Sequence, residues 1–385
     1  MMHICFITNE YPKDGFAHGG IGSFVKTLAT ALNDKEIKVS VVGINYISKN
    51  ETEKNGAVTI YRLKKSKLKG LAWYFNSNEI NKKIQEIHKK QPITIIEGSE
   101  LSLAFIKKIE KIKYVIRLHG GHHFFAEAEN RGINPWKGFQ EKKSFKKADA
   151  FIAVSNYVKR HTENYLSFCN RPLEVIGNPI DTNFFRPNEG NKSENKIVFV
   201  GTLCEKKGIR QLIQAFSLVN REYPEVTLEI YGRDWLFSDG SSYFQMLREK
   251  ELSQLGEKTA KNINFHGAIA FTDIPKAYAS AAVCVFPSHM ETLGLVALEA
   301  MAMKKAVVFT NKGPGPEVII NKKTGLLCNP HKPEDIANKI IWFLKNKEKT
   351  KKIVEEAREF VQLNYGLKNV VSQNVLFYHK IVEEL

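Results

Sequence analysis

The sequence of 385 residues predicts an α/β protein of two Rossmann-like domains, with parallel sheets that face each other across a cleft. Short β-branched runs alternate with helix-length segments, which is typical of βαβ units. This series restarts after residue 195, and the segment before it, 177–195, is rich in Asn, Pro, Gly and Ser, like a linker. The length also suits two hydrophobic cores. We therefore expect domains at 1–180 and 181–365, with a helix at about 366–385 that packs back on the first.

The expected elements follow this alternation in order. Strands are predicted at 3–8, 38–43, 93–96, 113–118 and 150–154, and again at 196–201, 226–231, 262–266, 282–286 and 306–310. Helices of the first half are predicted at 21–33, 78–90, 100–110 and 156–166, and residues after about 333 show only helical spacing. Ligands of open parallel sheets bind at the carboxyl ends of strands, so functional residues should directly follow strands.

Composition excludes several classes of protein. With 43% hydrophobic and 25% charged residues, the chain is expected to fold rather than to be disordered. No apolar run reaches the roughly 18 residues of a membrane span, and the first residues lack the features of an export signal. The five cysteines are scattered without a C-x-x-C pair, so we expect core thiols in a reducing cytoplasm.

Positive charge is concentrated in the first half. Residues 1–180 hold 29 Lys and Arg against 17 Asp and Glu, within a net charge of +16 for the chain. Basic clusters at 62–69 and 142–147 lie near apolar and aromatic residues, namely Leu63, Leu68, Leu71, Trp73, Tyr74 and Phe75. This combination favours an anionic membrane surface as a partner. A buried helix edge or a general bias toward lysine is the alternative. We find no nucleic-acid-binding motif and expect no nucleic-acid partner.

In each half of the chain, a glycine-containing segment follows the first strand. Gly20 and Gly22 lie in the segment 18–23, and Gly201 and Lys207 lie in the segment 201–208. Glycines let a backbone approach phosphate closely, and a helix N-terminus or a lysine favours the anion. Neither segment matches the dinucleotide fingerprint or the P-loop. A tight turn and a solvated lysine pair are the respective alternatives.

The segment 287–302 carries two acids at a strand–helix turn. Glu291 lies in the loop, and Glu299 lies within an otherwise apolar helix. A buried carboxylate needs a partner, and a ligand hydroxyl would serve. The alternative is a lone acid on the solvent side of the helix.

Three histidines follow the strand at 113–118. His119, His122 and His123 allow a zinc hypothesis, but no carboxylate or cysteine is adjacent, so residues lining the cleft are the preferred interpretation. No D-x-D pair is present to hold a cation on a diphosphate, so we expect neither a metal nor another cofactor.

Taken together, these segments resemble the retaining glycosyltransferases of family four, which have the GT-B architecture. The strongest block lies between Ile263 and Pro330 and contains the two glutamates eight positions apart with Gly294 between them. The resemblance covers nearly the whole chain and implies that a nucleoside-diphosphate sugar is a substrate. It also implies an acceptor-binding first domain, a donor-binding second domain, and the junction motif that begins at Asn178.

The resemblance assigns roles to single residues. It implies that Glu291 holds hydroxyls of the donor sugar, that Glu299 holds the ribose, and that His119 lies near the reacting carbon. Lys207 would neutralise the diphosphate. Backbone groups of Gly20, Gly22, Gly201, Leu293 and Gly294 would contact the donor.

One position departs from the family pattern. Thr202 stands where the family usually has an arginine that supplies a second cation to the diphosphate. Its absence weakens the leaving-group site unless another cation compensates, and Lys206 and Arg233 are the candidates.

The predicted function is the transfer of a sugar, with retention, to a glycan or lipid-linked acceptor, in a pathway of cell-surface polysaccharide synthesis. The predicted location is the cytoplasm, with possible binding to the inner face of the membrane. A nucleotide-sugar epimerase of the same fold and a non-catalytic nucleotide-sugar binder are the alternatives. The paired glutamates favour transfer.

Overall fold

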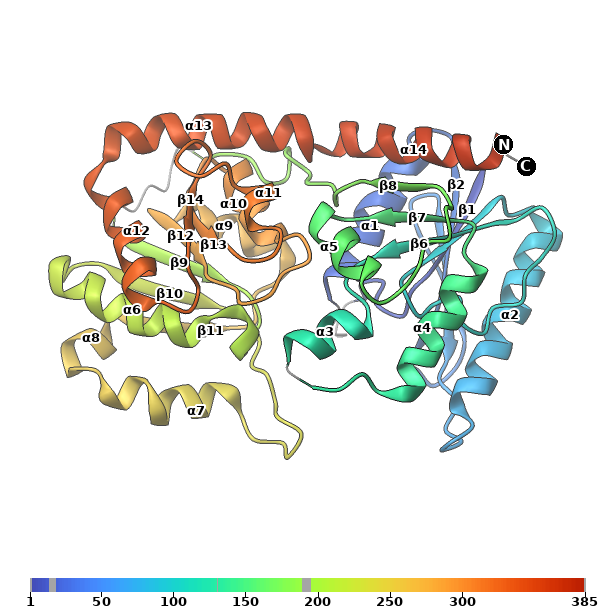
Figure 1. The fold of residues 1–385 in the computed structure, drawn as a ribbon, viewed down its shortest axis with the longest axis horizontal. Coiled ribbons are helices and arrows are strands. Elements are labelled where there is room, and N and C mark those ends of the chain that lie inside the picture. Colours follow the sequence, from blue (N-terminus) through green and yellow to red (C-terminus); the bar gives the residue numbers. More distant parts are fainter. Residues whose placement is uncertain (1, 14–18, 130, 189–194, 384–385) are drawn as a thin grey trace. The chain divides into compact units, whose positions relative to one another are not determined.

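The computed structural model describes all residues except 1, 14–18, 130, 189–194 and 384–385. The chain divides into two compact units, one made of Met1–Pro179 with Leu367–Leu385 and the other of Ile180–Gly366 (Figure 1). These limits lie within one residue of the expected ones. Both units contain a largely parallel sheet covered by helices, as predicted, while the cleft and the assignment of acceptor and donor to the two units stay predictions.

Unit 1 contains an eight-stranded sheet in the order β3-β4-β2-β1-β5-β6-β7-β8, parallel except for the β3–β4 pair. The strands are β1 (His3–Ile7), β2 (Lys38–Asn45), β3 (Glu51–Asn55), β4 (Val58–Lys64), β5 (Ile95–Gly98), β6 (Lys113–Leu118), β7 (Ala150–Ala153) and β8 (Leu173–Val175). The helices are α1 (Gly20–Asn33), α2 (Ala72–Lys90), α3 (His122–Ala128), α4 (Pro135–Lys147), α5 (Asn156–Glu163) and α14 (Leu367–Glu383).

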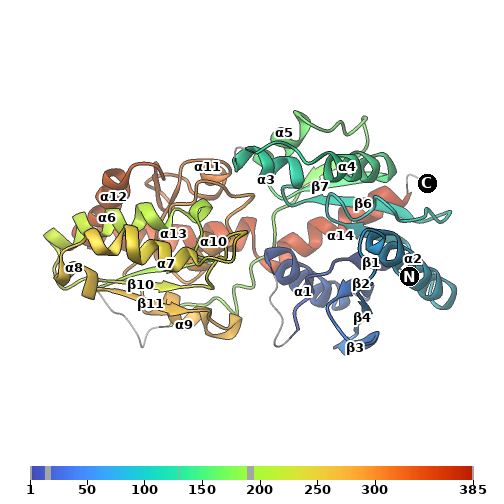
Figure 2. The ribbon, with the colours of Figure 1, turned by 90° about the horizontal axis from the view of Figure 1, so that it is seen from below.

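Both faces of this sheet are covered. Strands β1, β5 and β7 are buried along their whole length, as parallel strands between two helical layers should be. Helices α1 and α14 pack on one face, and α2 and α4 lie on the other (Figure 2). Helix α1 buries Phe24, Val25, Leu28 and Leu32, the spacing of one apolar face.

A buried polar network attaches α14 to the sheet of unit 1. Nε of Arg117 on β6 lies 2.7 Å from Oε1 of Glu97 on β5. Arg117 also donates to Asn374 Oδ1 at 2.5 Å, and the Tyr378 hydroxyl donates to Glu97 at 2.6 Å. These contacts join the C-terminal helix to the sheet of the first unit, where the sequence placed it.

Unit 2 contains a six-stranded, all-parallel sheet in the order β11-β10-β9-β12-β13-β14. The strands are β9 (Lys196–Val200), β10 (Thr227–Tyr231), β11 (Ile263–Gly267), β12 (Val283–Phe286), β13 (Ala306–Thr310) and β14 (Leu326–Cys328). The helices are α6 (Ile209–Glu222), α7 (Tyr243–Lys250), α8 (Glu257–Lys261), α9 (Ile274–Ala279), α10 (Leu295–Ala302), α11 (Gly315–Val318), α12 (Pro333–Lys345) and α13 (Lys347–Asn364), with 3₁₀ turns η1 (Glu205–Lys207), η2 (Leu252–Gln254) and η3 (Phe271–Asp273).

The helix expected at 100–110 is wrong, because this segment forms consecutive turns. Its backbone amides form short turns, such as Ile106 to the Leu103 carbonyl at 3.1 Å, and several of its remaining backbone groups bond to side chains of neighbouring helices. Asn81 of α2 donates to the Phe105 carbonyl and accepts from the Lys107 amide, and Lys147 of α4 donates to the Ala104 and Ile106 carbonyls. Tertiary contacts therefore override the local helical pattern.

The sequence reading also missed the hairpin of β3 and β4. Strand β3 (Glu51–Asn55) is polar and mostly exposed at the edge of the sheet, so it lacks the apolar run that marks the other strands. Among the helices that the structure describes, none combines the length and apolar character needed to cross a membrane.

Candidate functional site

The predicted donor residues of the second half lie on the loops and helix that follow β9, β10 and β12 in unit 2, whereas Gly20 and Gly22 belong to unit 1. Strands β9 and β12 are neighbours, and the sheet extends from them in opposite directions, which is the position where open parallel sheets bind ligands. The His289 amide donates to the Lys206 carbonyl at 2.9 Å, which joins the two loops. Gly208 has φ +67°, and a Cβ there would lie 2.0 Å from the Pro287 carbonyl oxygen. Only glycine permits this approach.

An ion pair joins the same two loops. Nζ of Lys207 lies 2.5 Å from Oε1 of Glu291, and the Ser288 hydroxyl donates to the same oxygen at 2.8 Å. The structure thus brings together two predicted site residues that are 84 positions apart. The Lys207 side chain is 24% exposed and that of Glu291 10%, so an anionic ligand can reach the pair from solvent.

Helix α10 begins beside this pair. Gly294 caps it with φ +94°, and a Cβ there would lie 2.3 Å from the Phe309 ring, so glycine is required. The side chain of Leu293 is buried in the core, which leaves only its backbone for a ligand. The helix N-terminus carries partial positive charge and favours an anion.

Glu299 lies inside α10, not on its solvent side. Its side chain is buried, and the Tyr278 hydroxyl donates to Oε2 at 3.0 Å. Burial raises the pKa of Glu299 to about 7. The lone-acid alternative is therefore wrong. The partner found is a tyrosine that sequence reasoning did not single out, because nothing in its local pattern distinguishes it from a core aromatic.

Thr202 lies where the loops after β9 and β10 touch. The Leu203 amide donates to the Arg233 carbonyl at 2.9 Å. A Cβ on Gly232 would lie 1.7 Å from the Gly201 carbonyl oxygen, so the two backbones are in direct contact. Arg233 is exposed. A cation is thus available directly beside the position that lacks the expected arginine.

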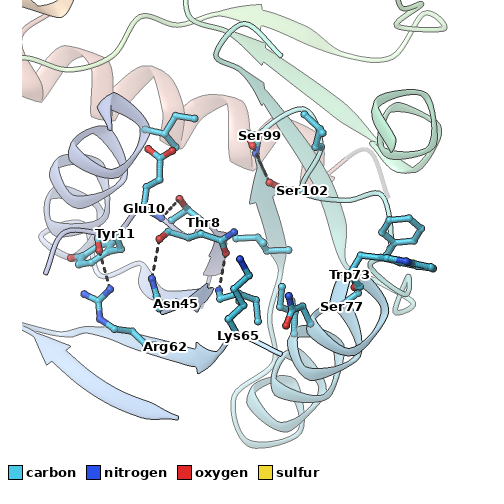
Figure 3. Close-up of a pocket in the computed structure, with 18 of the residues that line it drawn as sticks. Thr8, Glu10, Tyr11, Asn45, Arg62, Lys65, Trp73, Ser77, Ser99 and Ser102 are labelled. Carbon is cyan, nitrogen blue, oxygen red and sulfur yellow. Dashed lines mark hydrogen bonds between the residues drawn. The ribbon is translucent and has the colours of Figure 1, made fainter. Parts of the chain in front are cut away.

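Unit 1 has its own switch point, between β1 and β5, and a cavity of about 610 Å³ opens there (Figure 3). Hydroxyl and amide groups dominate its polar lining, which includes Thr8, Asn9, Asn45, Asn76, Ser77, Ser99 and Ser102. Trp73 and Phe105 supply aromatic surface, and Glu10 and Lys65 supply charge. Sequence reasoning named none of these as site residues, although several directly follow strands, which was the available signal.

The glycine turn of unit 1 borders this cavity. A Cβ on Gly22 would lie 1.9 Å from the Glu10 carbonyl oxygen, so this glycine is needed for packing. Gly20 is exposed, and a Cβ there would meet no atom of the described residues within 4 Å. His18, in the same segment, lies outside the described residues.

His119 follows β6, with its ring centroid 5.2 Å from that of Phe24 on α1. Burial, reinforced by the nearby Arg117 charge, lowers the pKa of His119 to about 3, so its imidazole is neutral at physiological pH. The loop behind it is held by an acid that sequence reasoning missed. Glu100 accepts from the Gly120 and Gly121 amides at 2.7 and 2.9 Å.

The other two histidines of this tract have internal partners. The Asn134 amide donates to His122 Nε2 at 2.8 Å, and His123 Nδ1 lies 3.2 Å from Glu141. Across the described part of the chain, His, Cys, Asp and Glu side chains form no group of three or more placed to hold a metal ion. The zinc alternative thus gains no support. Independence from metals stays a prediction.

The predicted basic membrane patch is wrong at three residues. Arg62 is buried, pairs with Glu53 at 3.0 Å and donates to the Tyr11 and Pro12 carbonyls, while Leu63 is buried in the core. Lys147 is half-buried on backbone carbonyls. Arg62 and Leu63 are consecutive residues of β4 and point to opposite faces of the sheet, and both are buried. Lys147, at the end of α4, reaches the carbonyls of the turns at 100–110.

Two family models match the chain in succession. Glycosyltransferase Family 4 matches residues 18–184, and Glycosyl transferases group 1 matches residues 181–360. The chain is a group 1 glycosyltransferase of the GT-B fold. The recognition made from the glutamates and glycine turns is thereby confirmed, and so is the fold class.

Relatives of this glycosyltransferase cover most of its length, and solved structures of similar fold cover all of it. An uncharacterized glycosyltransferase of Methanocaldococcus jannaschii is 26% identical over 89% of each chain. N-acetyl-α-D-glucosaminyl L-malate synthase of Bacillus anthracis is 23% identical over 71% of this chain and 70% of its own. Among solved structures, sucrose-phosphate synthase of Thermosynechococcus elongatus has a TM-score of 0.86 at 20% identity, and Anabaena HepE in complex with UDP-glucose has 0.77 at 19%, each covering both chains fully.

Proposed function

We propose that this glycosyltransferase moves a hexose from a nucleoside-diphosphate sugar to a glycan or lipid-linked acceptor, with retention, in polysaccharide or lipopolysaccharide synthesis at the cell surface. The observation that carries the proposal is the Lys207–Glu291 pair beside the N-terminus of α10, at the switch point of unit 2. Cation, carboxylate and helix end together suit a sugar attached to a diphosphate.

The donor's bond breaks between the anomeric carbon and the diphosphate oxygen, which leaves with the electron pair. Lys207 and the first amides of α10 stabilise the negative charge that develops on it, the kind of interaction that contributes most to such transfers. Glu291 orients Lys207 and accepts hydrogen bonds from sugar hydroxyls. The acceptor hydroxyl bonds to the anomeric carbon and passes its proton to the departing phosphate. We assign no protein nucleophile.

Glu299 serves the nucleotide end of the donor in this proposal. Its buried carboxyl, held by Tyr278, accepts from a ribose hydroxyl. Arg233 supplies the second cation that Thr202 does not, and Gly201, Thr202 and Gly294 provide close backbone approach.

Unit 1 binds the acceptor. The hydroxyl and amide groups around its cavity suit a sugar, and Trp73 offers an aromatic face. The neutral His119, which cannot act as a cationic acid near pH 7, donates or accepts a hydrogen bond near the reacting carbon, where Gly20 and Gly22 also approach the donor. We propose that no metal takes part.

We place the reaction in the cytoplasm, at the inner face of a membrane where lipid-linked acceptors lie. All five cysteines, each within the described residues, are free thiols, which supports a reducing compartment.

Thermal melting with UDP-, GDP- and ADP-sugars tests the donor site, because a ligand that binds the native state raises the melting temperature. UDP-glucose is the first probe, since HepE is solved with it. A shift in wild type that is lost in Lys207→Met is expected. Binding of no nucleotide sugar would contradict the proposal. Radiolabelled transfer then separates it from the alternatives, because an epimerase interconverts free nucleotide sugars and a binder gives no product.

A further inference from the structure

Helices α2 and α4 begin near each other in unit 1 (Figure 1), and exposed apolar side chains lie at and just before both helix starts. The Trp73 and Trp136 rings meet edge to face, with centroids 5.3 Å apart, although they are 63 positions apart in the chain. Trp136 stacks on Phe139 at 5.7 Å. We call this surface the aromatic edge; it comprises Leu68, Leu71, Trp73, Tyr74, Phe75, Ile133, Trp136 and Phe139, all of them exposed.

Lysines surround the aromatic edge. Lys143 lies over the Phe105 and Phe139 rings, with Nζ 4.6 and 5.7 Å from the centroids. The exposed lysines nearby in sequence are Lys64, Lys67, Lys69, Lys137, Lys142 and Lys146. The acid of α4, Glu141, is buried and accepts from backbone amides, so it offsets none of this charge at the surface.

A hollow of about 360 Å³ adjoins the edge. Lys64, Lys65 and Lys67 line it together with Phe75 and Glu79. The Asn76 side chain accepts from the Ser66 amide at 2.8 Å and so holds the lysine segment against α2. Three cations outnumber the single carboxylate, so the hollow suits a phosphate group.

We propose that the aromatic edge docks on an anionic phospholipid bilayer, with its rings among the acyl-chain ends and the surrounding lysines on headgroup phosphates. Aliphatic Leu68, Leu71 and Ile133 contribute nothing to stacking on sugars but suit hydrocarbon. A second copy placed on the same edge would bring like charges together, whereas an anionic surface complements them.

The proposed function gives this docking a purpose, because Trp73 belongs both to the acceptor cavity and to the aromatic edge, and its ring lies 4.6 Å from that of Phe105, which also lines the cavity. The lipid part of an acceptor bound in the cavity would emerge from the cavity beside the bilayer. That step rests on the proposed function. Vesicle binding is measured without donor or acceptor, and donor binding is measured by thermal melting. Failure of the docking proposal can therefore be distinguished from failure of the proposed function.

The test is co-sedimentation with phosphatidylglycerol–phosphatidylcholine vesicles and with pure phosphatidylcholine vesicles, at low and high salt. Wild type should sediment with the anionic vesicles at low salt. Trp136→Ser/Phe139→Ser should bind about tenfold more weakly, and Lys64→Glu/Lys67→Glu/Lys69→Glu about a hundredfold more weakly. The matched controls are Trp235→Ser/Leu236→Ser and Lys349→Glu/Lys351→Glu/Lys352→Glu, exposed positions in unit 2 that should leave binding unchanged. Equal melting temperatures establish that the variants fold.

Quenching by brominated lipids tests insertion. In a Trp235→Phe/Trp342→Phe background only Trp73 and Trp136 fluoresce, and acyl-chain bromines should quench them in anionic vesicles. Sedimentation without quenching, binding unaffected by the Trp136/Phe139 variant, or no sedimentation at low salt would each overturn the proposal. A dimer in sedimentation velocity that the same variant dissolves would assign the edge to a second copy instead.

Discussion

Glu97 and Glu100 of unit 1 and Glu291 and Glu299 of unit 2 are held by different kinds of partner. In unit 1, Glu97 is paired with Arg117 and accepts from Tyr378, and Glu100 accepts from loop amides. The hydrogen-bond partners of these carboxylates are therefore fixed parts of the fold. In unit 2, Glu291 accepts from the partly exposed Lys207 and the Ser288 hydroxyl, and Glu299 accepts from one tyrosine hydroxyl. A carboxylate held by backbone and buried cations supports the fold. A carboxylate that is held by a lysine or a hydroxyl, in the loop or helix that follows a strand's carboxyl end, can exchange those partners for a ligand.

The largest expected effect is on the stability of unit 1. Glu97→Gln leaves Arg117 buried without its counter-charge, so the free energy of unfolding should fall by about 3–5 kcal/mol. Urea denaturation measures it. Glu291→Gln is the control and should change stability by less than about 1 kcal/mol, as for a partly exposed pair. Equal losses in both variants would contradict the distinction between the units.

The next effect is on catalysis in unit 2. Lys207→Met and Glu291→Gln should each lower kcat/KM by about 10²–10³-fold, on the scale of one lost group that stabilises the transition state. Lys276→Met, an exposed lysine paired with Asp273 on the same unit, is the matched control and should be neutral. Unimpaired transfer by both site variants would remove the pair from the mechanism.

Stability should depend on pH through one buried glutamate in each unit, but only the glutamate of unit 2 should also affect nucleotide binding. Burial raises the pKa values of Glu100 and Glu299 to about 7, so the folded state retains protons that the unfolded state releases above about pH 4.5. Stability therefore falls as pH rises from about 4.5 to about 7. Glu100→Gln and Glu299→Gln should each flatten melting temperature against pH, whereas only Glu299→Gln should weaken nucleotide binding. Weaker binding in both would show that the units are coupled.

A smaller effect concerns the missing arginine. Thr202→Arg should tighten nucleotide-sugar binding by about 1–2 kcal/mol, the strength of a charge-assisted hydrogen bond. Titration calorimetry measures the change. Weaker binding by a folded variant would indicate that Arg233 already fills the position.

The smallest expected effect is that of chelation. If Lys207 and α10 supply the counter-charge, excess EDTA should leave transfer unchanged. Activity abolished by EDTA and restored by magnesium or manganese would assign the diphosphate to a metal instead.

The sequence by itself determined the two-sheet fold, because buried parallel strands require continuous apolar runs, and these runs are visible along the sequence. It also pointed to Glu291, Lys207 and the glycine turns, since these lie in segments that follow strands, and to Glu299 as an acid within an apolar helix, while the family resemblance supplied their roles. It failed where partners come from distant segments. The turns at 100–110 depend on Asn81 and Lys147, and the burial of Arg62 depends on Glu53 and the Tyr11 carbonyl.

Only the tertiary structure decided which charged side chains pair within the protein and which remain accessible to a ligand. Local sequence records that Glu299 is acidic and its helix apolar, but Tyr278, 21 positions away, makes it a buried, protonatable acid. Likewise, Trp73 and Trp136 form one edge only because α2 and α4 begin side by side. Contacts between residues far apart in the chain depend on how strands pair and helices pack, and no local pattern contains that information.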